Sequence, residues 1–208
     1  MNALILKDLM IIQPTLRKKA IIFSLLVLFV GFIQQGFLLL PLVALLAIFQ
    51  VGATFFDDDL CNWDQYAHTL PVTRKDIVRS KYLLGILLLL VGLVVTTPLA
   101  YFINHFSDLV IFTNLFLTFS LSLTLGFCML AFTLPINILF SFLSGKPLMP
   151  IFVFLLWLFP DFTEFDVGEL LIKLIGWDEF LYFTPIFGLI ILWLSYVVSL
   201  SFYKRKDL

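Results

Sequence analysis

Few residues of this chain carry the side chains that nucleotide chemistry needs. Gly145-Lys146 is its single Gly-Lys pair, the pair that closes the phosphate-binding loop of many ATPases. Pro147 stands where such a loop has Ser or Thr, and no glycine occurs five residues before Gly145. The two histidines, His68 and His105, fall on opposite predicted sides of a membrane. We therefore expect no catalytic, metal or cofactor site in this chain.

Charge gathers instead in one segment, residues 57–82, between two apolar stretches. This charged segment holds nine charged residues: five Asp, two Lys and two Arg. Asp57 is of a type that often caps a helix, which predicts a short helix from Asp57 to about Ala67. Trp63 and Tyr66, three residues apart, would share one side of that helix.

The second half of the charged segment predicts another helix. Pro71 ends the first helix, and Thr73 with Asp76 three residues later forms a weak capping box. This second helix would continue into the next apolar stretch. Lys75 and Arg79, four residues apart, would share a face.

The charged segment allows two interpretations. In the first, it is an interfacial elbow, with aromatic rings at the lipid headgroups and basic side chains on anionic lipid. In the second, it docks a cytosolic subunit through an apolar tip at Leu70 and Pro71 with charges as a rim. The candidate docking residues are Trp63, Tyr66, Leu70, Pro71, Arg74, Lys75 and Arg79.

The composition indicates that the chain is an integral membrane protein. The chain of 208 residues is 62% hydrophobic and 13% charged, with a mean hydropathy of +1.09. Soluble domains are about 45–50% apolar and about 25% charged. No basic patch lies away from the predicted membrane ends, so nucleic acid is not expected as a partner. Six apolar segments follow along the chain: Ala20–Gln34, Phe37–Phe56, Tyr82–Ile103, Leu109–Leu134, Leu148–Phe159 and Leu181–Tyr203.

The basic residues predict how these segments are oriented. With both termini in the cytoplasm, 12 of the 13 Lys and Arg fall on the cytoplasmic side, and only Lys173 falls outside. The expected fold is one all-α integral membrane domain over residues 1–208. It has six transmembrane helices, an N-terminal interfacial helix, the cytoplasmic charged segment and a short outer amphipathic helix in residues 161–180. The first and fifth segments are short for a span of about 20 residues.

A stripe of small polar residues recurs every four residues in the fourth segment: Asn114, Thr118, Ser122 and Gly126. One interpretation is a helix-packing face, because small residues let helix backbones approach each other. The other is a surface that faces a transport path.

Acidic residues gather on the predicted outer side, in the region of the amphipathic helix: Asp161, Glu164, Asp166 and Glu169. The helix is expected to be a lid over the short fifth segment. Alternatively, its acidic rim attracts a cationic peptide that leaves the pore.

The centres of the predicted spans contain no ionisable residue. Pumps and proton-coupled carriers need such groups inside the membrane. This absence argues against a self-contained pump or proton antiporter, so we expect the energy for any active transport to come from a partner. A passive pore stays open as an alternative.

The stretch TLPVTRKDIVRSKYLLG resembles type-2 ABC exporter permeases, especially the compact six-span group that includes bacterial peptide-toxin and lantibiotic exporters. The ends LILKDL and SFYKRKDL resemble the N-terminal interfacial helix and the C-terminal close of that group. The residues that match its run after the second span are Leu70, Pro71, Val72, Thr73, Arg74, Ile77, Val78, Lys81 and Tyr82.

The resemblance implies a permease subunit in a bacterial cytoplasmic membrane. Its partners would be two cytosolic ATPase subunits, which bind the ATP and Mg, and a second permease copy or homologue. The charged segment would be the coupling loop that enters a groove on the ATPase. The expected cargo is amphipathic or hydrophobic, with a peptide toxin or antimicrobial peptide as the first choice. The alternatives are a non-transporting immunity or sensor module that binds a peptide, and a passive pore or scaffold.

Overall fold

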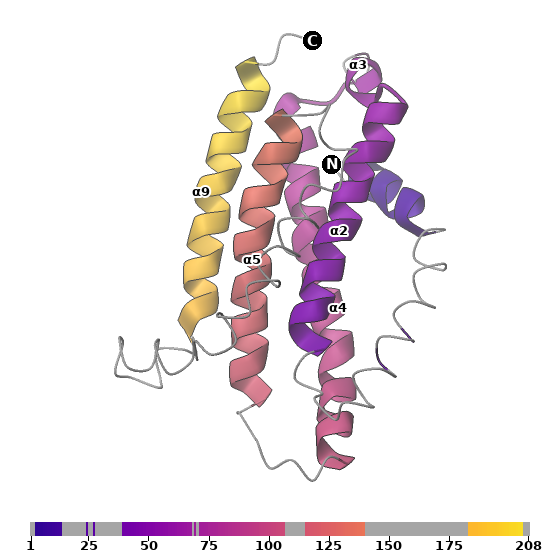
Figure 1. Cartoon of the computed structure of the whole chain (residues 1–208). Coiled ribbons are helices and arrows are strands. Elements are labelled where there is room, and N and C mark those ends of the chain that lie inside the picture. The colour runs from indigo at the N-terminus through magenta and orange to yellow at the C-terminus, as the bar shows by residue number, and fades with distance from the viewer. Residues whose placement is uncertain are drawn as a thin grey trace, which may run out of the picture.

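The computed structural model describes residues 3–13, 24, 27, 39–67, 69, 71–106, 115–139 and 183–205. Figure 1 shows these parts as an all-helical bundle. A helix over residues 3–13 lies beside the upper part of this bundle. The other helices are α2 (Leu39–Leu60), α3 (Trp63–Ala67), α4 (Arg74–Phe106), α5 (Leu115–Leu139) and α9 (Thr184–Arg205).

Four helices of the described part are long and apolar enough to cross a membrane: α2, α4, α5 and α9. They coincide with the second, third, fourth and sixth predicted spans. The predicted spans at residues 20–34 and 148–159, and the outer helix region at residues 161–180, lie outside the residues that the structure describes apart from two isolated helical positions.

The directions of the four long helices agree with the predicted order of spans. In Figure 1, α2, α5 and α9 run toward the end that carries α3, and α4 runs away from it. Arg74 at the start of α4 donates a hydrogen bond of 3.5 Å to the carbonyl of Tyr203 near the end of α9. At the other end, the hydroxyls of Ser120 and Thr184, near the starts of α5 and α9, lie 3.3 Å apart.

The predicted helix cap at Asp57 is wrong. The helix α2 continues through Asp57 to Leu60, so the three aspartates form its last turn. The chain reverses at Asn62, which has a φ of 48°, a conformation that Asn tolerates better than most residues. The short helix α3 then begins at Trp63. Carboxylates are disfavoured at a helix C-terminus by the helix dipole, so these aspartates need cations from elsewhere in the fold.

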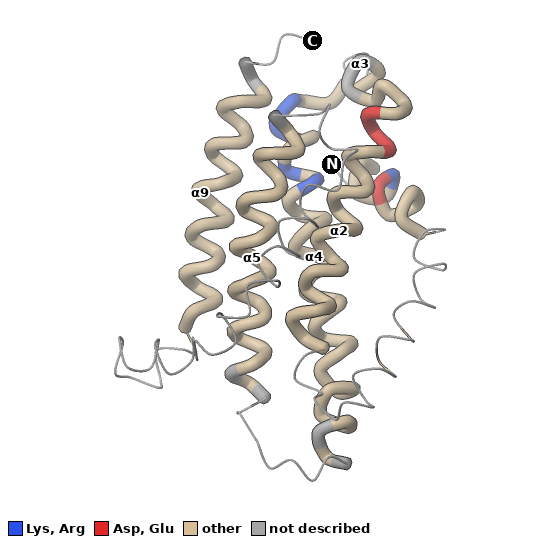
Figure 2. Tube along the Cα trace, viewed as in Figure 1, with Lys and Arg blue, Asp and Glu red and all other residues tan. Residues whose placement is uncertain are grey.

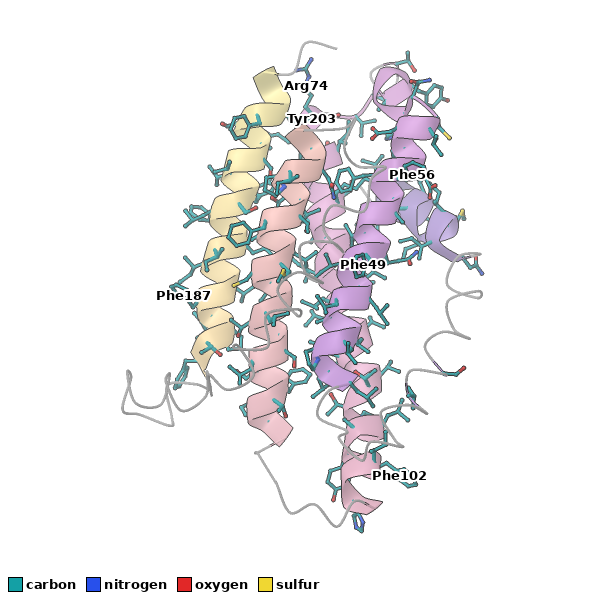
Figure 3. The ribbon with its side chains drawn as sticks, in the orientation of Figure 1. Phe49, Phe56, Arg74, Phe102, Phe187 and Tyr203 are labelled. Carbon is teal, nitrogen blue, oxygen red and sulfur yellow. The ribbon has the colours of Figure 1, made fainter. Side chains whose placement is uncertain are left out.

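The core lies where the four long helices meet. The helix α5 packs against α2 and α9, and α4 packs against the other three. Leu89 of α4 and Leu130 of α5 are almost completely buried there. Phe102 and Phe187 point away from the bundle in Figure 3, and each is 63% exposed. Such exposed apolar side chains suit a surface that faces lipid.

Among the residues that the structure describes, Lys, Arg, Asp and Glu lie at one end of the bundle. Figure 2 shows the described Lys, Arg, Asp and Glu residues near α3, at the end where α2, α5 and α9 finish. The shafts of the four long helices carry none of them in the described part of the chain. This end therefore holds the residues from which a functional site can be built.

Candidate functional site

Four charged side chains from three separate segments meet at this end of the bundle. The Lys81 ammonium of α4 lies 3.1 Å from Asp8 Oδ1 and 2.6 Å from Asp58 Oδ2. The Lys7 ammonium lies 3.1 Å from Asp8 Oδ1 and 2.6 Å from Asp58 Oδ1. These four residues, the ion cluster, join the helix at residues 3–13, the last turn of α2 and the start of α4.

The ion cluster is internally neutral, and its centre is buried while Lys7 and Asp58 are partly exposed. The side chains of Asp8 and Lys81 are 1% and 5% exposed. Lys81 also donates to the Thr54 hydroxyl at 3.2 Å, so three acceptors receive its three N–H groups. Two cations and two carboxylates cancel. Burying ions is tolerated when each is paired in this way, and breaking one pair leaves an uncompensated charge.

Aromatic rings contact both cations of the ion cluster. The Lys7 ammonium lies 3.9 Å from the centroid of the Trp63 ring, and the Lys81 ammonium lies 4.9 Å from that of Phe55. Cations over ring faces at such distances are attracted by the π-electrons. Trp63 of α3 is therefore held against the helix at residues 3–13, which fixes α3 to the rest of the bundle.

A small cavity of about 30 Å³ lies beside the ion cluster and has room for one or two water molecules. It marks the place where the ends of α2, α5 and α9 meet the start of α4. Its lining residues are Phe55, Asp58, Asp59, Trp63, Ile77, Val78, Lys81, Asn137, Ile138 and Tyr203.

The predicted capping box at the start of α4 is confirmed. The Thr73 hydroxyl donates to Asp76 Oδ2 at 2.6 Å, and the Thr73 amide donates to the same oxygen at 3.3 Å. The Asp76 amide in turn donates to the Thr73 hydroxyl at 3.3 Å. These bonds satisfy amides that the first turn of a helix otherwise leaves without acceptors.

The predicted docking residues divide into two groups. Tyr66, Pro71, Lys75 and Arg79 are exposed at the end of the bundle. Trp63 and Arg74 make contacts within the chain instead, with Lys7 and with the Tyr203 carbonyl. The placement of Leu70 lies outside the described residues.

The described part of the polar stripe packs within the bundle. The Ser122 hydroxyl donates to the Thr118 carbonyl at 2.7 Å, as serines in membrane helices often do. Gly126 is buried, and a Cβ added to it would collide with the side chain of Leu89 in α4. This contact favours the packing interpretation of the stripe. Asn114 lies outside the described residues.

The outer acidic residues also lie outside the described part of the chain: Asp161, Glu164, Asp166 and Glu169. The lid and the cargo-attracting rim therefore both stay predictions.

The ion cluster was not predicted from the sequence. In the sequence, Lys7 and Asp8 were interpreted as part of an interfacial helix, and Asp58 as one of several acidic residues in the charged segment. The pairs that matter join residues 51 and 73 positions apart in the chain. The adjacent charges inside the apolar stretch LILKDLMII were the one available signal, because a buried charge in such a stretch requires a partner.

The comparison with known proteins identifies a family for this chain. Residues 3–204 match the family model described as ABC-2 family transporter protein. Searches of curated proteins and of solved structures returned no match. Proteins of this family are multi-pass membrane permeases without catalytic activity, which pair with separate ATPase subunits. The match covers almost the whole chain, and the chain therefore belongs to the ABC-2 family of transporter permeases.

Proposed function

We propose that this chain is the permease of an ATP-driven exporter and that its charged segment, residues 57–82, receives the ATPase. One observation carries the proposal: the ion cluster joins both ends of the segment to each other and to the helix at residues 3–13, while Tyr66, Pro71, Lys75 and Arg79 stay exposed. A docking element must have both properties. It must offer free side chains to a partner, and it must pass the partner's motion to the membrane helices.

The helix at residues 3–13 belongs to the same rigid unit. Asp8 and Lys7 tie this helix to Lys81 and Asp58 respectively. A displacement of the charged segment would therefore carry the N-terminal helix with it. The first transmembrane segment follows that helix in the chain, so it would receive the same motion. The ATPase, with its ATP and Mg, would therefore act on the charged segment and on the first transmembrane segment through one unit.

The cargo that agrees best with the described spans is amphipathic or hydrophobic. The shafts of the four long helices carry no charge among the described residues, so a strongly charged solute would find no counter-ion there. A peptide toxin or an antimicrobial peptide fits this chemistry. Six spans, cytoplasmic termini, a second permease copy or homologue and a bacterial cytoplasmic membrane complete the proposal.

Purification in mild detergent tests the proposal. The wild-type chain should retain an ATPase subunit. Pro71→Asp should weaken that association and lower ATPase-dependent transport, while the bundle keeps its melting temperature. His105→Asp places the same side chain at the opposite end of α4, where His105 is also exposed, and should leave the ATPase bound.

The outcome also separates the alternatives. If no ATPase accompanies the wild-type chain, a peptide-binding immunity or sensor module, or a passive pore, replaces the exporter. If the ATPase binds Pro71→Asp as tightly as wild type and transport continues, the tip of the charged segment is not the docking point.

A further inference from the structure

A proline interrupts the hydrogen-bond ladder of α5 inside the bundle. Pro135 has no N–H, so the carbonyl of Ala131, four residues earlier, lacks its helical donor. Ser195 of α9 supplies a replacement, because its hydroxyl donates to the Ala131 oxygen at 2.6 Å. A membrane helix bends most readily where a backbone hydrogen bond is missing. Here a side chain of the neighbouring helix α9 replaces the missing donor.

The Ser195 hydroxyl is itself held by α4. The Tyr82 hydroxyl lies 2.8 Å from the Ser195 oxygen and 2.7 Å from the Ser199 oxygen. Ser195 has one hydrogen, and it goes to the Ala131 carbonyl, so Tyr82 must donate to Ser195. Ser199 must then donate to Tyr82. The result is a directed chain from Ser199 through Tyr82 and Ser195 to the Ala131 carbonyl.

The hydroxyl chain and the ion cluster involve neighbouring residues of α4. Lys81 and Tyr82 are consecutive in α4, and consecutive residues on a helix point in directions about 100° apart. Lys81 contacts the residue 3–13 helix and the last turn of α2, and Tyr82 contacts α9. A rotation or shift of this part of α4 would change both sets of contacts together. The ring of Tyr82 also packs edge-on against Tyr196, with centroids 5.4 Å apart, which limits its freedom.

We propose that Tyr82 and Ser195 are positioning residues that transmit the state of the charged segment to α5 at Pro135. This inference rests on the proposed function, because the ATPase supplies the motion. While Tyr82 holds Ser195, the Ala131 carbonyl is satisfied and α5 keeps its present shape. When α4 moves at its cytoplasmic end, the bond to Ser195 is lost or redirected, and α5 is free to bend at its proline.

Spin labels can follow this motion without knowledge of the cargo. Labels at Phe102→Cys and Phe116→Cys, both exposed at the far ends of α4 and α5, would be placed in a background with Cys61→Ser and Cys128→Ser. The sample is the complex with the ATPase that copurifies. We expect the distance between the labels to shift when ATP, Mg and vanadate trap the ATPase.

Single hydroxyl removals identify the relay. Tyr82→Phe should retain the ATPase but lose the nucleotide-dependent shift between the labels. Tyr196→Phe removes a neighbouring hydroxyl that takes no part in the chain, and it should keep the shift. If Tyr82→Phe shows the wild-type shift, the relay is overturned.

A second pair of variants separates transmission from stability. Ser195→Ala should lower the melting temperature, since the Ala131 carbonyl loses its donor. Adding Pro135→Ala restores the backbone donor and should recover the melting temperature, while the shift stays lost. Recovery of the shift in the double variant would reduce Ser195 to a structural role and overturn the proposal. Failure of the wild-type chain to bind any ATPase would overturn the proposed function itself, and the relay with it.

Discussion

The Lys81 ammonium lies 2.6 Å from Asp58 Oδ2, although Asp58 lies in the last turn of α2 and Lys81 belongs to α4. This pair binds the two arms of the charged segment to each other. Asp58 stands at a helix C-terminus, where a carboxylate is disfavoured, and Lys81 supplies the opposite charge from a position seven residues after the start of α4. Lys81 therefore offsets the unfavourable position of Asp58 at the end of α2.

Lys81→Met should be strongly destabilising. The variant leaves buried Asp8 and partly exposed Asp58 with Lys7 as their one remaining cation in the cluster, and removing one partner of a buried ion pair costs about 3–5 kcal/mol. The thermal unfolding midpoint in detergent measures the effect. Lys75→Met, at an exposed position, is the matched control and should change stability by less than about 0.5 kcal/mol.

The charge balance of the ion cluster makes a second variant informative. Lys81→Met with Asp58→Asn leaves one cation, Lys7, and one carboxylate, Asp8, at 3.1 Å. This double variant should be more stable than Lys81→Met alone. Equal stability of the two would mean that charge balance does not determine the cost, and a wild-type melting temperature for Lys81→Met would contradict the buried cluster.

Gly126→Ala should destabilise the bundle although alanine is the better helix former. Its Cβ would collide with Leu89, which is completely buried, and overpacking a core costs about 1–3 kcal/mol. Leu89→Ala should make Gly126→Ala better tolerated, because it removes the colliding atoms. At Gly52 the nearest atom to an added Cβ is 4.0 Å away, so Gly52→Ala should not destabilise. If Gly126→Ala melts like wild type, the packing interpretation of the stripe fails.

Local patterns in the sequence predict the elements well but not their contacts. The length of the apolar stretches predicts the four described spans, and Thr73 with Asp76 predicts the start of α4. Each of these signals is contained in one continuous stretch of sequence. The end of α2 was missed for a physical reason. Aspartates are common helix caps, and the pairing of Asp58 with distant Lys7 and Lys81, which makes that carboxylate acceptable in a last turn, cannot be read from local sequence.

The candidate site shows the same division. Exposure of Tyr66, Lys75 and Arg79 follows from their places in the charged segment. The inward position of Trp63 could not be predicted from the charged segment, because it depends on contact with Lys7 near the N-terminus. The link from Ser195 to the carbonyl freed by Pro135 is equally distant, since 64 residues separate Ser195 from Ala131.

Thr73→Ala should loosen the first turn of α4. It removes the hydroxyl that accepts from the Asp76 amide and donates to the Asp76 carboxylate, and loss of such a cap costs about 0.5–2 kcal/mol. Hydrogen exchange across residues 73–80 should become faster. Thr73→Ser keeps the hydroxyl and should exchange like wild type. Unchanged exchange in Thr73→Ala would show that the capping box does not hold this turn.

Lys75→Glu with Arg79→Glu should slow the association of the ATPase by roughly tenfold at low salt, because rim charges act mainly on the association rate. Both side chains are exposed and lie on one face of α4, so reversing them should not disturb the ion cluster. The effect should shrink as added salt screens exposed charges. Lys75→Arg with Arg79→Lys keeps both charges and should associate at the wild-type rate. If the charge-reversed variant associates at the wild-type rate in low salt, or is slowed equally at every salt concentration, these residues do not form an electrostatic rim.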